Sequence, residues 1–163
     1  MSPMSPHDFS IALRIRHPSI DPGEVTRQLG IVPQHAWRAG EPRTIEAGEV
    51  GSAFHRETYW VGLLPPRPMF GPVLGTTTPR LVEALKGNAT HPQIALNFTL
   101  LKMKRAAGFW REFAEQGGTI ECLLQVHKAD RFQLDLSQEL LVPLVELRVT
   151  LSIEVDGGLR AAA

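Results

Sequence analysis

The chain has 163 residues, of which 43% are hydrophobic and 21% charged, an ordinary composition for one globular domain. Its 17 Lys and Arg residues balance its 17 Asp and Glu residues, so the zero net charge argues against nucleic acid or an anionic membrane as a partner. Cys122 is the only cysteine, which excludes an internal disulfide and is typical of a reducing compartment. Residues 1–8 lack the features of a signal peptide and no apolar run could span a membrane, so we expect a cytoplasmic protein.

The first elements in chain order are a strand and a capped helix. Apolar and polar side chains alternate over residues 9–16, which predicts a half-buried strand that ends before Pro18. Asp21 is placed to cap a helix that begins at Pro22. Gly30 can adopt the left-handed conformation that ends such a helix.

The middle of the chain is rich in Pro and Gly. We predict a loop over residues 40–56, which are weakly patterned, and a short strand around Trp37. Residues 57–64 predict a second clear strand, which the prolines of residues 65–68 end. A long loop and then a short helix over residues 79–87 are expected to follow.

Residues 93–104 fit two patterns. The alternation that starts at Ile94 fits a strand, whereas a second apolar spacing and a capping-box pair, Thr90 with Gln93, fit a helix. We favour the helix. Residues 106–116 then carry the single apolar stripe of a helix.

The C-terminal part predicts a strand, a helix and a strand. The first strand runs from residue 120 to residue 127, and Ser137 caps the helix that follows. Pro143 lies inside this helix, where it should kink or shorten it. Residues 149–155 alternate again and predict the last strand.

These elements predict an α+β fold. Because the strands alternate apolar and polar side chains, one face of the sheet should be buried and the other exposed. We therefore expect a mainly antiparallel sheet of four to five strands with helices packed on one face. The domain should span residues 9–156, with a disordered tail at 1–8 and a frayed tail at 157–163.

No catalytic, metal-binding or cofactor-binding signature is present in the sequence. The six histidines lack helical ligand spacing and Cys122 lacks a neighbouring cysteine, so we expect no metal and no cofactor. Cys122 falls on the inward side of its strand, where burial should raise the thiol pKa and make it inert. Nucleophile-elbow, P-loop and dinucleotide motifs are absent. We therefore assign no catalytic residue.

The most suggestive residues for function are Trp37 and Arg38, which share a turn-rich segment with Glu41 and Arg43. Arg can stack on an indole or clamp a carboxylate or phosphate, and both residue types are enriched at binding hot spots. The alternative is structural: Trp37 fills the edge of the core and Arg38 pairs with Glu41 or a helix end. If the strand that carries Trp60 pairs beside Trp37, three more residues could join the surface. The candidate binding residues are Trp37, Arg38, Glu41, Arg43, His55, Arg56 and Trp60.

Residues 21–42 read Asp-Pro-x-Glu-Val-Thr-x-x-Leu-Gly-Ile-x-Pro-x-x-Ala-Trp-Arg-x-Gly-Glu-Pro. This run resembles the N-terminal signature of a bacterial family of small domains of unknown function, family 4279. The strand with Tyr59 and Trp60 and the later elements follow in the expected order. The resemblance implies a cytoplasmic bacterial α+β domain and brings no activity, substrate or cofactor with it. The chain departs from the family pattern at Pro143 and in residues 65–75.

Three kinds of function fit these observations. The favoured one is a non-catalytic module that binds a protein or a small anionic ligand; an immunity-type inhibitor of a toxin is a variant of it by analogy alone. An enzyme of unknown class would instead use His55, Glu57 or Glu41, and a deep pocket that holds two of them would support it. A self-associating domain could pair an edge strand with its twin, giving a homodimer.

Overall fold

The computed structural model of the chain describes residues 9–44, 50–64, 92–127, 134 and 136–156. The tails predicted at 1–8 and 157–163, the helix predicted over 79–87 and the Pro-rich stretch 65–75 lie outside these residues. None of the described helices is both long and apolar enough to cross a membrane.

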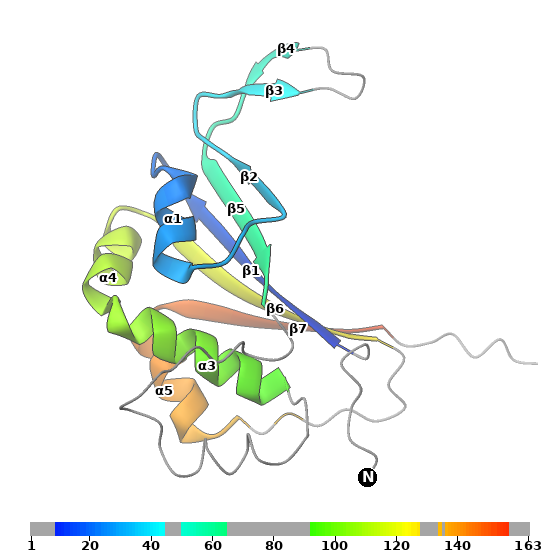
Figure 1. Ribbon diagram of the computed structural model, residues 1–163, viewed down its shortest axis with the longest axis vertical. Coiled ribbons are helices and arrows are strands. Elements are labelled where there is room, and N and C mark those ends of the chain that lie inside the picture. Colours follow the sequence, from blue (N-terminus) through cyan, green and yellow to red (C-terminus); the bar gives the residue numbers. More distant parts are fainter. Residues whose placement is uncertain (1–8, 45–49, 65–91, 128–133, 135, 157–163) are drawn as a thin grey trace, which may run out of the picture.

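A twisted sheet of five strands, in the order β2-β5-β1-β6-β7, is the frame of the fold (Figure 1). β1 is central and pairs antiparallel with β5 and β6, while β2 extends one edge by pairing antiparallel with β5. The strand bounds are β1 Phe9–His17, β2 His35–Trp37, β5 Thr58–Leu63, β6 Thr119–His127 and β7 Val149–Asp156. The predicted α+β fold is confirmed.

The sheet is mixed, because β7 pairs parallel with β6. A parallel neighbour needs a crossover connection, and α5 (Gln138–Glu146) lies in the connection between these two strands. The expectation of a mainly antiparallel sheet therefore holds for three of the four strand pairs and is corrected for the fourth. Pro143 lies inside α5 without ending it.

The described helices cover one face of the sheet (Figure 1). They are α1 Pro22–Leu29, α3 Pro92–Arg105, α4 Ala107–Glu115 and α5. The helix favoured for residues 93–104 is confirmed as α3, and the alternative of a strand is wrong. Asp21 Oδ1 accepts a hydrogen bond from the Gly23 N–H at 3.1 Å, and Gly30 has the left-handed φ of 62° that ends α1.

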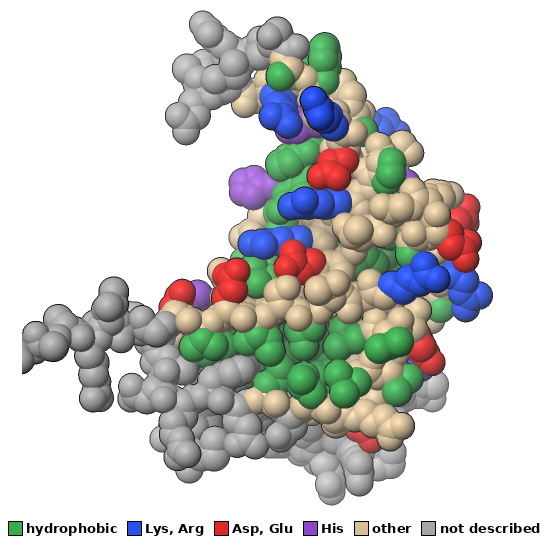
Figure 2. All heavy atoms as spheres, turned by 180° about the vertical axis from the view of Figure 1, so that it is seen from behind, with side chains coloured by type: hydrophobic (Ala, Val, Ile, Leu, Met, Phe, Trp, Pro, Cys, Tyr) green, Lys and Arg blue, Asp and Glu red, His purple; other side chains and the backbone are tan. Residues whose placement is uncertain are grey.

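The hydrophobic core lies between these helices and the sheet. Alternate residues of β1 and β6 face it, and Trp110 and Phe113 of α4 pack into it. The strand residues are Phe9, Ile11, Leu13, Ile15, Ile120, Cys122, Leu124 and Val126. The opposite face, here called the open face, is covered by no described helix, and Figure 2 shows Lys or Arg and Asp or Glu side chains interspersed over it.

Two short strands form a separate sheet that projects beyond the main one (Figure 1). β3 (Pro42–Thr44) and β4 (Val50–Phe54) pair antiparallel and are together called the arm. The loop predicted over residues 40–56 is therefore wrong. All three residues of β3 are exposed, so the arm has no buried face there and no alternation marks it in the sequence.

Candidate functional site

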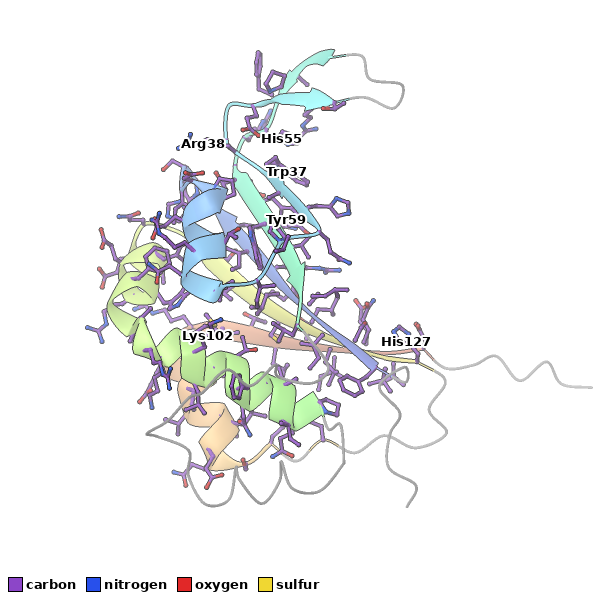
Figure 3. The ribbon with its side chains drawn as sticks, viewed as in Figure 1. Trp37, Arg38, His55, Tyr59, Lys102 and His127 are labelled. Carbon is purple, nitrogen blue, oxygen red and sulfur yellow. The ribbon has the colours of Figure 1, made fainter. Side chains whose placement is uncertain are left out.

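An aromatic stack stands on the open face where the arm meets the main sheet. Strand pairing places Trp37 of β2 directly opposite Tyr59 of β5, with ring centroids 4.5 Å apart. The His55 ring lies 4.6 Å from Trp37 and nearly parallel to it. Figure 3 shows Trp37 between His55 and Tyr59. The Arg16 guanidinium lies 5.8 Å from the centre of the Tyr59 ring, so a cation lies at the Tyr59 end of the aromatic stack.

The position of Trp37 answers the question whether it belongs to the core. Its side chain is half-buried, lies on the open face and is not part of the hydrophobic core. His55 and Tyr59 stack on the indole, so a ligand would meet its edge rather than a free ring face. Trp37 is thus held between two rings and presents its edge to this face.

A pocket of about 500 Å³ opens beside this stack. The described residues that line it are Pro18, Trp37, Arg43, His55, Arg56 and Glu57. Four of the seven residues predicted from the sequence meet here, from β2, from the arm and from the segment that links the arm to β5.

The described residues that line the pocket carry a surplus of positive charge. Within the described part of the chain, Arg43 and Arg56 have no ion pair. The carboxylate of Glu57 lies 3.8 Å from the guanidinium of Arg16, so its charge is already opposed. Among the described residues, no carboxylate therefore opposes the charge of either arginine.

Arg38 and Glu41 form the turn that leads into the arm. Glu41 Oε2 accepts a hydrogen bond from the Arg38 backbone N–H at 2.8 Å, and the Glu41 N–H donates to the Arg38 carbonyl at 3.1 Å. Gly40, with a φ of 84°, donates its N–H to the His55 carbonyl at 2.8 Å. The expected pairing of Arg38 with Glu41 thus uses the Arg38 backbone, and the Glu41 carboxylate has a structural role.

Trp60 does not join the site, which corrects the sequence interpretation. Its strand pairs beside β2 as required, but Trp60 points to the core face, opposite Ala36, and is completely buried. Its indole N–H donates to Thr26 Oγ1 of α1 at 3.0 Å. Tyr59, one residue earlier, is the ring that reaches the open face.

Sequence reasoning also missed Thr58, which ties the turn to the sheet. Thr58 is 1% exposed, accepts a hydrogen bond from the Ala39 N–H at 3.1 Å and donates to the Ile20 carbonyl at 2.7 Å. The spacing of 19 residues between Ala39 and Thr58 left no local signal for this contact.

The described residues give little support for a metal site or a reactive cysteine. They contain no group of three or more His, Cys, Asp or Glu side chains that could hold a metal ion. Cys122 is 3% exposed, and burial, with a further contribution from the charge of Glu121, raises the pKa of its thiol to about 12. The thiol is therefore protonated at neutral pH.

Comparison with known families covers the part of the chain that carries the site. Residues 7–69 match the family described as a domain of unknown function, DUF4279. These residues belong to that family. The DUF4279 segment includes β1 to β5 and every described residue that lines the pocket, whereas α3 to β7 lie beyond it. No curated protein and no solved structure matches the chain.

Proposed function

We propose that this protein is a non-catalytic binding module for a protein or small anionic ligand, and that Arg43 and Arg56 bind the anionic group. One observation carries the proposal: two arginines without an ion pair among the described residues line a pocket in which Glu57 is already opposed by Arg16. A guanidinium can form paired hydrogen bonds with a carboxylate or a phosphate.

The shape of the site supports the same proposal. Its volume of about 500 Å³ lies within the roughly 300–1,000 Å³ typical of small-molecule sites. The stack of His55, Trp37 and Tyr59 fixes one wall before any ligand binds. Because a preformed wall loses little conformational entropy on binding, it favours affinity.

A titration with inorganic phosphate and, separately, with citrate tests the proposal. Two-dimensional NMR should show saturable shifts of the Trp37 indole N–H and of the amides of residues 55–57. The double variant Arg43→Gln, Arg56→Gln should lose these shifts. Arg111→Gln removes an exposed arginine of α4, outside the pocket, and should leave them unchanged. Shifts that survive the double variant, or that never saturate with either anion, would reject the proposal.

An enzyme is a second candidate, because His55 and Glu57 line the same pocket. Both groups also have structural contacts: the imidazole stacks on Trp37, and the carboxylate lies near Arg16. Conversion of a bound ligand that His55→Gln and Glu57→Gln each abolish would favour the enzyme. Nothing in the described residues favours an inhibitor of a toxin over these two functions.

The proposed setting is the bacterial cytoplasm. It is supported by the family resemblance, by the single buried cysteine and by the absence of a membrane-spanning helix among the described elements. The zero net charge supports a partner other than nucleic acid.

A further inference from the structure

An exposed hydrophobic surface lies at the edge of the molecule formed by α5 and β7. These two elements contact each other and together expose five large hydrophobic side chains. They are Leu141 (41% exposed), Val142 (40%), Val145 (76%), Ile153 (42%) and Val155 (52%). In Figure 2 hydrophobic side chains form a band below the charged side chains of the open face, at the height that β7 has in Figure 1. Apolar surface gathered in this way is typical of an interaction site.

The backbone of β7 points to the same conclusion. β7 is an eight-residue strand at the end of the main sheet, and no described strand pairs with its outer side. Alternate residues of such an edge present N–H and C=O groups outward, where they can pair with another strand. The surface therefore offers both hydrogen bonds and apolar contacts.

We propose that a second copy of this chain covers this surface, with the two β7 strands paired antiparallel about a two-fold axis at Ser152. This register pairs residues 149–155 of the two β7 strands, since Val149 then lies opposite Val155 of the second copy and Leu151 lies opposite Ile153. Residues directly opposite in an antiparallel pair share a face, so the apolar side chains meet on one face and the polar ones on the other.

The charges at the two ends of β7 complement each other in this register. Arg148, exposed and directly before the strand, lies opposite Asp156 of the second copy, and Thr150 lies opposite Glu154. Among the described residues Arg148 has no ion pair. Asp156 Oδ2 is 3.1 Å from His127 Nδ1, and its side chain is 77% exposed, so it can accept a second partner. Each dimer would contain the Arg148–Asp156 contact twice.

The two-fold axis also brings the apolar helix surfaces together. Because the axis is normal to the sheet, both copies of α5 fall on the same face of the joined sheet, beside the paired β7 strands. Leu141, Val142 and Val145 would then be covered across the axis. The pocket is unaffected, because β2 and β7 lie at opposite edges of the sheet. The inference is therefore independent of the proposed function.

Analytical ultracentrifugation of the full chain over a range of concentrations tests this dimer. Wild type should dimerise reversibly. Arg148→Asp and Asp156→Arg should each weaken the dimer by about tenfold, because each variant places like charges opposite each other twice. The double variant Arg148→Asp, Asp156→Arg exchanges the charges and should restore most of the affinity.

Hydrophobic variants supply a matched control. Ile153→Lys should abolish the dimer, whereas Leu63→Lys, at a position of nearly the same exposure (43%) on β5, should leave it intact. Circular dichroism would show that each variant is folded. A wild-type protein that is monomeric at every concentration would overturn the proposal. So would a dimer that tolerates Ile153→Lys, or one that neither charge variant weakens.

Discussion

Trp37 and Trp60 lie close together along the strand pairing, yet they face opposite sides of the sheet. Trp60 is completely buried and belongs to the core, while Trp37 is half-buried and belongs to the stack on the open face. Comparing the two residues therefore distinguishes an indole that stabilises the core from an indole that forms part of a surface. The binding proposal depends on Trp37 being dispensable for the fold.

Replacing each tryptophan by alanine should give very different losses of stability. Trp37→Ala removes two ring contacts, each about 0.5–1.5 kcal/mol, and should lower the free energy of unfolding by about 1–2 kcal/mol. Trp60→Ala leaves a cavity in the core and should cost about 3–5 kcal/mol. Urea denaturation measures both. Equal losses would show that Trp37 is a core residue, and the candidate site would then lack its wall.

At the level of elements, the sequence could predict those that bury one face. The capping residues of α1 and the alternation of β1, β6 and β7 are local signals, and each of these elements forms as predicted. The arm was missed because its exposed β3 has no alternation to read. The parallel direction of β7 was missed because alternation reports which face is buried and not the direction in which a neighbouring strand runs.

The candidate site was predictable only in part, for a related reason. Arg43 follows Trp37 closely in sequence, and His55 and Arg56 directly precede the strand that was expected to pair beside Trp37. All three line the pocket with it. The choice between Tyr59 and Trp60 could not be made, because β5 carries apolar side chains on both faces. Only the register with β2 decides which of them stands beside Trp37.

The contact between β5 and the segment after α1 depends on a glycine. A Cβ atom at Gly62 would lie 2.6 Å from Cη2 of Trp60 and 3.1 Å from Cγ2 of Ile31. Because the Trp60 ring is completely buried, it has no space to move away. Gly62→Ala should therefore destabilise the protein by about 1–3 kcal/mol.

Gly108 provides the control for this substitution. It lies in α4, and a Cβ atom there would meet no other atom within 4 Å. Gly108→Ala should stabilise the protein by up to about 1 kcal/mol, since alanine favours the helix. Thermal unfolding of the two variants compares them directly. A neutral or stabilising Gly62→Ala would mean that β5 and the Ile31 segment are less closely packed than described.

At the scale of the whole molecule, the interface between the sheet and the helices contains a buried histidine. His17 at the end of β1 is 3% exposed, and its ring centre lies 4.8 Å from that of Phe113 on α4. Its Nδ1 accepts hydrogen bonds from the N–H groups of Ser19 (3.0 Å) and Ile20 (2.9 Å). An accepting Nδ1 carries no proton, so the ring is neutral in the folded protein.

This arrangement predicts that the protein loses stability in mild acid. Burial lowers the pKa of His17 below its ordinary value of 6.5, while the nearby Gln116 side chain acts in the opposite direction. Below pH 6.5 the unfolded chain therefore binds a proton that the folded protein resists. The contribution of His17 to the free energy of unfolding is complete above pH 6.5. It falls as the pH drops toward the pKa that His17 has in the folded protein. Urea denaturation at a series of pH values would measure it. His17→Asn keeps a side-chain acceptor but cannot titrate, so the variant should lose less stability than wild type between pH 7 and pH 5. An equal loss in both proteins would assign the acid sensitivity to other groups.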